Sequence, residues 1–277
     1  MKSTFRKSLD VTKSALVTAL AMMCILFNIN AHAKSSEPMV VLVHGAHLTA
    51  SSWAQVEIGL GKKGFNSMAL NLPGREDNVN PKDITLTSSA KYLCDKLVSV
   101  KQKLILVAHS QGGAVVNHAL SMCPKIEVER IIYLASVVPL NGEKPFDRLS
   151  KADEGHYFQG VEYQQGNGLM VIYNPQAFVA TFSSQQTSPH TERIMAASVS
   201  EPAAIGEGVV MLAEDSFKAI KKFYIFTEQD KIISVLSQRG IAKQINTIKT
   251  GSINSGHIPM ITHADSLLPI LVEFMSI

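Results

Sequence analysis

Short apolar runs alternate with longer segments of helical spacing along most of this chain. The apolar runs have the length of buried strands, and they lie at residues 39–43, 65–72, 104–109, 128–134, 223–227 and 245–249. The predicted helices between and after them lie at residues 51–63, 86–100, 114–122, 234–244 and 264–275. Strands that alternate with helices predict an α/β fold, in which helices flank a mainly parallel sheet.

This alternation breaks between about residues 141 and 213, where Gly, Gln and Ser are mixed with apolar residues. A long irregular insertion inside a domain is usually functional or disordered. Apolar side chains such as Phe158, Phe178 and Phe182 argue against disorder. We therefore predict a cap over the carboxyl end of the sheet, with Phe178 and Phe182 on one face of a docking helix.

The first 33 residues have the pattern of a secretory signal peptide. Basic residues precede a nearly unbroken apolar stretch over residues 15–27, and Ala31-His32-Ala33 forms a small-x-small cleavage pattern. The apolar stretch is too short to predict a membrane span. We expect cleavage after Ala33 and export from a bacterial cytoplasm to the periplasm or the medium. The mature domain would be residues 34–277, without a stable membrane anchor.

The formal net charge of +3 comes from the predicted signal peptide. Residues 1–33 carry four basic side chains and one acidic side chain, so the rest of the chain is close to neutral. A neutral domain gives no support for nucleic-acid binding.

Two cysteines, Cys94 and Cys123, remain in the predicted mature domain. Export permits a disulfide between them, and two buried free thiols are equally consistent with the sequence. Neither lies in a C-x-x-C or histidine-rich segment, so no metal site is predicted.

Ser110 lies where a predicted strand meets a predicted helix. Residues 108–113 read A-H-S-Q-G-G, which matches the nucleophile-elbow pattern G-x-S-x-G except that Ala108 replaces the first glycine. That position requires a small side chain where strand and helix cross, and alanine adds only one methyl group. The alternative is an ordinary glycine turn with Ser110 as a helix N-cap.

An acid and a histidine follow two later predicted strands. Asp230 comes after the strand at 223–227, and His257 follows the strand at 245–249. The carboxyl ends of parallel strands meet at one edge of a sheet, where ligands bind. His257 would accept the proton of Ser110 and later donate it to the leaving group, while Asp230 would orient the imidazole. The order Ser, Asp, His is the one found in hydrolases with a nucleophile elbow.

Two backbone N–H groups are candidates for stabilising the oxyanion. Gln111 follows the nucleophile directly, and Ala46 lies in the turn after the first predicted strand.

The acid and the other histidines have alternative interpretations. Glu228 lies close enough in the sequence to take the role of Asp230, and Asp230 could also be an ordinary solvated loop acid. Structural roles are predicted for His44, His109, His118 and His263, and no role is assigned to His47, His156 and His190.

Several segments resemble the α/β-hydrolase superfamily, above all the branch of plant methylesterases, hydroxynitrile lyases and their bacterial esterase relatives. The matching segments are V-L-V-H-G-A (41–46) with Trp53, N-L-P-G (71–74), V-A-H-S-Q-G-G (107–113), T-E-Q-D-K-I (227–232) and G-H (256–257). Glu201-Pro202 also resembles a cap motif of that branch. The resemblance spans about residue 38 to the C-terminus and is weakest in the cap.

The resemblance implies a cofactor-free serine hydrolase that acts on a small or medium ester through an acyl-enzyme. Two departures bear on the reaction: Ile258 follows His257 where the lyases have a lysine, and Gly45 stands where they have a threonine. Both favour hydrolysis over cyanohydrin cleavage. The alternatives are a lactone or amide hydrolase or a lyase on the same fold, or a ligand-binding protein without catalysis.

Overall fold

A parallel sheet of six strands forms the centre of the fold in the computed structural model, which describes residues 37–75 and 79–277. Its strands are β1 (Met39–Val43), β2 (Ser67–Leu70), β3 (Leu104–His109), β4 (Val128–Leu134), β8 (Lys221–Thr227) and β9 (Lys249–Ile253). They are ordered β2-β1-β3-β4-β8-β9, and all neighbours are parallel. The predicted α/β architecture is therefore confirmed.

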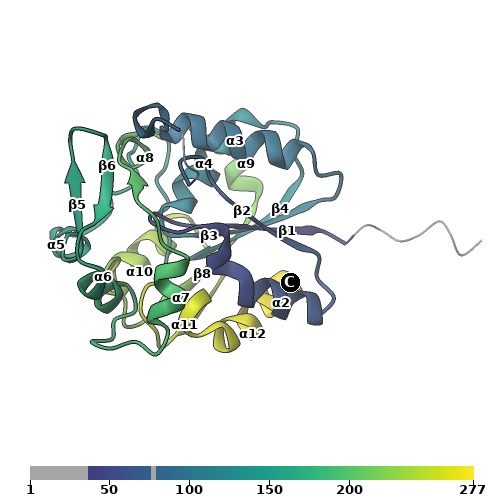
Figure 1. Cartoon of the computed structure of the whole chain (residues 1–277). Helices are drawn as coiled ribbons and strands as arrows, with labels where there is room; N and C mark the ends of the chain where they lie inside the picture. The colour runs from purple at the N-terminus through teal and green to yellow at the C-terminus, as the bar shows by residue number, and fades with distance from the viewer. Residues whose placement is uncertain (1–36, 76–78) are drawn as a thin grey trace, which may run out of the picture. The chain divides into compact units, whose positions relative to one another are not determined.

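Helices cover both faces of this sheet (Figure 1). Helices α3 (Leu86–Val98) and α4 (Gly112–Met122) pack together on one face, and α2 (Ala54–Lys62) and α12 (Ala264–Met275) pack together on the other. The other elements outside the cap are η2 (Ala50–Trp53), η3 (Pro81–Asp83), α9 (Glu214–Ala219), α10 (Val235–Gln244) and α11 (Pro259–Thr262). The main core lies between the sheet and these helices, because strands covered on both faces are apolar on both faces.

The last strand lies later in the chain than the sequence predicts. Residues 245–248 do not form a strand, because the backbone N–H of Ile245 still bonds to helix α10 and Asn246 has a left-handed φ of 53°. Strand β9 begins at Lys249, which pairs with Phe223. It is a mostly polar strand at the edge of the sheet, so it lacks the apolar pattern of a buried strand.

Three smaller boundaries also differ from the prediction. Strand β2 covers residues 67–70 of the predicted 65–72, and the predicted helix 51–63 is divided into η2 and α2. Helix α4 begins two residues earlier than predicted, at Gly112, because both glycines join its first turn.

The cap contains regular structure that its sequence pattern does not reveal. It holds helices α5 (Lys151–Tyr157), α6 (Pro175–Phe182), α7 (Thr191–Ala196) and α8 (Ala204–Glu207). Within the described part of the chain, β5 (Val161–Gln164), β6 (Leu169–Ile172) and β7 (Glu201–Pro202) form a small antiparallel sheet. The predicted irregularity is wrong, because these elements are too short for a clear period. Figure 1 shows β5, β6 and α5 beyond one end of the central sheet.

The predicted docking face in the cap is confirmed. Phe178 and Phe182 are buried on α6, and their rings stack with centroids 4.1 Å apart. Both rings also pack edge-on against His47, in the loop after β1, so the cap is joined to the sheet domain by an aromatic cluster.

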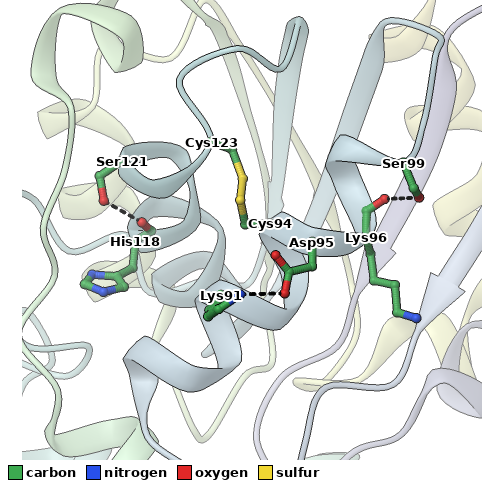
Figure 2. The surroundings of a disulfide bond; sticks show 8 residues. All are labelled: Lys91, Cys94, Asp95, Lys96, Ser99, His118, Ser121 and Cys123. Carbon is green, nitrogen blue, oxygen red and sulfur yellow. Dashed lines mark hydrogen bonds and ion pairs between the residues drawn. A yellow bond between two sulfur atoms is a disulfide. The ribbon is translucent and has the colours of Figure 1, made fainter.

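A disulfide joins Cys94 in α3 to Cys123 at the end of α4 (Figure 2). It resolves the alternative that the sequence leaves open, and it links the two helices that pack on one face of the sheet. The predicted signal peptide lies outside the described residues. Among the helices that the structure describes, none has the length and apolar character needed to cross a bilayer.

Candidate active site

Ser110 lies at a sharp turn between β3 and α4. Its φ is 51°, in the left-handed region that costs energy for a residue with a side chain. The turn is possible because the neighbouring chain comes close: a Cβ at Gly112 would lie 2.6 Å from the carbonyl oxygen of His44, and one at Gly45 would lie 2.6 Å from Cβ of Ser110. This is the geometry of a nucleophile elbow.

Hydrogen bonds connect Ser110, His257 and Asp230 in a line. The Ser110 Oγ lies 2.9 Å from Nε2 of His257, and Nδ1 of His257 lies 2.7 Å from Oδ2 of Asp230. The side chains of His257 and Asp230 are almost fully buried. The three residues come from the ends of β3, β9 and β8, so the sheet brings together positions that are 147 and 27 residues apart.

The Asp230 carboxylate is held by groups besides the histidine. Its Oδ1 accepts hydrogen bonds from the backbone N–H groups of Ile232 and Ile233, at 2.7 and 2.9 Å. Its Oδ2 accepts from the Thr227 hydroxyl at 2.8 Å and from the Gln238 amide at 3.2 Å. These donors fix the position of the carboxyl group whose Oδ2 lies next to His257 Nδ1.

The backbone of His257 is held on both sides. Its N–H donates to the carbonyl oxygen of Phe182 at 2.9 Å, and its carbonyl oxygen accepts from Nε2 of His109 at 2.8 Å. Burial lowers the pKa of His109 well below its usual range. Among the described residues its Nδ1 has no hydrogen-bond partner, which fits a neutral ring with its proton on Nε2. His109 therefore has a structural position beside the site.

A cavity of about 720 Å³ lies over Ser110 and His257. Ala46 and Gln111, the predicted oxyanion donors, are both part of its lining. Gln111 is the N-cap of α4, where the helix dipole and free N–H groups favour negative charge. The rest of the lining is mainly apolar and includes Phe146, Leu149, Phe158, Met170, Phe182 and Ile232.

The alternative acid, Glu228, lies apart from the histidine. It forms an ion pair with Arg239 at 3.0 Å, and its side chain is 29% exposed. Among the described residues, no three or more His, Cys, Asp or Glu side chains are grouped so that they could hold a metal ion.

Four of the other histidines lie at a helix end or have their own hydrogen-bond partners. His263 is the N-cap of α12, as predicted, and His118 Nδ1 accepts from the backbone N–H of Met211 at 2.9 Å. Nε2 of His44 accepts from the backbone N–H of Leu72 at 3.1 Å, and His47 Nε2 lies 2.7 Å from the Tyr157 hydroxyl.

One buried ion pair beside the cavity was missed by sequence reasoning. Glu201 lies in the cap strand β7 and pairs with Arg75, which lies in the loop after β2. The exposed fraction of each side chain is 1% or less. Glu201 also accepts a hydrogen bond from the Gln111 side chain at 2.7 Å. The resemblance of Glu201-Pro202 to a cap motif was the available signal, and nothing local marked Arg75 as its partner.

Comparison with known proteins agrees with the α/β fold of this chain. A family model described as "Alpha/beta hydrolase family" matches residues 40–268. The putative chloroplastic methylesterase 13 of Arabidopsis thaliana is 28% identical over 253 residues, which cover 86% of this chain and 56% of that protein. This chain therefore spans about half the length of that relative. Methylesterase 7 of the same plant is 25% identical over 258 residues, which cover 87% and 97% of the two chains.

Two solved structures show the same fold. A pyrethroid hydrolase from Sphingobium faniae JZ-2 has a TM-score of 0.74 at 17% identity, covering 86% of this chain and 97% of that one. An extracellular alpha/beta-hydrolase from a Paenibacillus species has a TM-score of 0.72 at 19% identity, covering 85% and 98%. With the elbow, the strand order and the family match taken together, the chain belongs to the alpha/beta hydrolase family.

Proposed function

We propose that this protein is a serine-type esterase that hydrolyses a carboxylic ester through an acyl-enzyme. The observation that carries the proposal is the hydrogen-bonded line from Ser110 through His257 to Asp230, of which Ser110 and His257 line the cavity. Relatives named as methylesterases and a structural neighbour named as a hydrolase support ester hydrolysis.

The reaction would proceed in two halves. The Ser110 oxygen attacks the ester carbonyl carbon and its proton passes to Nε2 of His257, while the backbone N–H groups of Ala46 and Gln111 stabilise the oxyanion. Collapse of the intermediate breaks the bond to the alcohol oxygen, which receives the proton from His257. Water then repeats the attack on the acyl-enzyme and releases the acid, restoring Ser110.

The substrate that fits the cavity is a small or medium ester with an apolar group. A volume of about 720 Å³ with a mainly apolar lining suits such a molecule. Hydrolysis is favoured over cyanohydrin cleavage at two positions. Ile258 follows the histidine and is fully buried, and a side chain at Gly45 would collide with Ser110.

The test is hydrolysis of a chain-length series of p-nitrophenyl esters by the protein from Lys34 onward. The Ser110→Ala variant should lose several orders of magnitude in kcat/KM. Ser121→Ala is a matched control, because this serine lies at the far end of α4 and donates to the backbone of His118. Equal turnover by Ser110→Ala and wild type, or no turnover of any ester by wild type, would overturn the proposal.

We further propose that the protein is exported from a bacterial cell, to the periplasm or the medium, after cleavage behind Ala33. The sequence pattern of residues 1–33 and the Cys94–Cys123 disulfide support an oxidising destination. Mass spectrometry of the protein recovered from periplasm and medium should give an N-terminus at Lys34. Recovery of the uncleaved chain from the cytoplasm alone would contradict this.

A further inference from the structure

The Glu201–Arg75 ion pair contacts both segments proposed to bind the oxyanion, and Glu201 itself lines the cavity. One oxygen of Glu201, Oε2, accepts the backbone N–H of His47 at 2.9 Å, and His47 is the residue after Ala46. The other oxygen, Oε1, accepts from the side-chain amide of Gln111 at 2.7 Å. A single carboxylate therefore contacts both chain segments whose N–H groups would face the substrate oxygen.

The Arg75 guanidinium offsets the charge of this carboxylate. An unpaired anion so close to a developing oxyanion would oppose catalysis, because the interaction is strong in a buried site. Arg75 bonds to Glu201 through one terminal nitrogen, and its Nε donates to the carbonyl oxygen of Leu48 at 3.0 Å. The pair can thus supply hydrogen-bond acceptors for positioning without a net negative charge.

Stability alone is a weak explanation for this buried ion pair. Burial of an ion pair contributes little net stability, because desolvation of both charges offsets their attraction. The pair also spans two parts of the fold, since Glu201 comes from the cap and Arg75 from a loop of the sheet domain 126 residues earlier. The position of the pair in the fold and its hydrogen bonds both indicate that it organises the two oxyanion segments.

We propose that Glu201 is a positioning residue that aligns the backbone N–H groups of Ala46 and Gln111, with Arg75 as its neutralising partner. This inference rests on the proposed esterase function. It assigns the cap a part in the rate of the chemical step as well as in the choice of substrate, because the cap contributes Glu201. Oxyanion donors act mainly in the transition state, so their misalignment lowers kcat more than it raises KM.

The test compares Glu201→Gln with Glu143→Gln in the mature enzyme. Glu143 also forms an ion pair in the cap region, with Arg148, and does not line the cavity. We expect Glu201→Gln to lower kcat by about 10- to 100-fold with KM changed less than about threefold. Its affinity for a trifluoromethyl ketone, which mimics the tetrahedral intermediate, should fall in parallel with kcat/KM. Glu143→Gln should match wild type in all three.

A second variant and an active-site count keep the result independent of folding. Labelling of Ser110 by a fluorophosphonate gives the fraction of folded, competent enzyme, to which each rate is normalised. Gln111→Met keeps the backbone N–H and the Arg75 pair but removes the bond to Glu201, and it should lower kcat by about three- to tenfold.

Three outcomes would overturn the inference. If normalised Glu201→Gln and Gln111→Met keep the wild-type kcat and ketone affinity while wild type hydrolyses esters, the inference alone fails. If Glu201→Gln raises KM alone, Glu201 instead contributes to substrate binding. If wild type hydrolyses no ester, the proposed function fails, and the inference fails with it.

Discussion

The backbone N–H of His257 donates a hydrogen bond to the carbonyl oxygen of Phe182, so the last residue of cap helix α6 anchors the proposed general base. The Phe182 ring also packs edge-on against the imidazole, with centroids 5.7 Å apart. The cap therefore forms part of the proposed active site. Any large movement of α6 away from the sheet would break this hydrogen bond to the proposed general base.

Replacing Gly256 should disturb this anchor. A Cβ at residue 256 would lie 2.4 Å from the carbonyl carbon and oxygen of Ser183, so Gly256→Ala must displace either α6 or the His257 loop. We expect kcat/KM to fall by about 10- to 100-fold, because small misplacement of a catalytic group has large effects on rate. Ester hydrolysis assays measure it.

Gly155→Ala is the matched control, because a Cβ there, in cap helix α5, would meet no atom within 4 Å. Its kcat/KM should equal that of wild type. Equal activity of the two alanine variants would show that the contact between α6 and the His257 loop does not position the histidine.

Asp230→Asn should separate the two candidate acids. The amide would remove the charge that stabilises protonated His257, and it would favour the wrong tautomer, so kcat should fall by about 10³- to 10⁴-fold. Glu228→Gln should leave kcat unchanged, because Glu228 pairs with Arg239 at the surface. The reverse ranking of the two variants in a steady-state assay would transfer the role to Glu228.

Loss of the disulfide should weaken the fold but leave the chemistry intact. The bond joins residues 29 positions apart, which corresponds to about 3.6 kcal/mol of unfolding free energy in the chain-entropy model. Urea denaturation of Cys94→Ser/Cys123→Ser against wild type measures it. Activity at 25 °C should be kept, because Cys123 lies about 16 Å along α4 from the elbow. A fall in kcat without a fall in stability would refute this separation.

Acid should destabilise the protein through two buried histidines. Burial lowers the pKa of His44 to about 3 and that of His47 to about 4. In the unfolded chain both keep an ordinary pKa near 6.5 and bind protons that the folded state rejects. Stability is therefore full above about pH 6.5 and falls as the pH drops towards 4, by up to about 1.4 kcal/mol per pH unit for each histidine.

Urea unfolding between pH 4.5 and 7.5 tests this dependence. His47→Gln should be less stable than wild type at neutral pH, yet its stability should fall less steeply with acid because one of the two groups is gone. A pH slope that is the same in the variant would show that His47 does not contribute.

Local patterns in the sequence were sufficient for five of the six strands of the parallel sheet and for the elbow. The apolar run before Ser110 and the glycines after it are adjacent in the chain, so the turn that they predict does not depend on distant contacts. The same holds for Asp230 and His257, each predicted from its place after a strand, and the structure joins all three by hydrogen bonds. Strand β9 was predicted at the wrong residues, because an edge strand needs no apolar pattern.

Only the tertiary structure revealed what surrounds that line of residues. Glu201 and Arg75 are 126 residues apart, and a buried ion pair leaves no periodic mark in either segment. The hydrogen bond from the His257 N–H to the Phe182 carbonyl oxygen likewise depends on how α6 packs against the sheet domain. Strand and turn patterns arise from neighbours in the chain, whereas the partners of a buried polar group are decided by which segments the fold brings into contact.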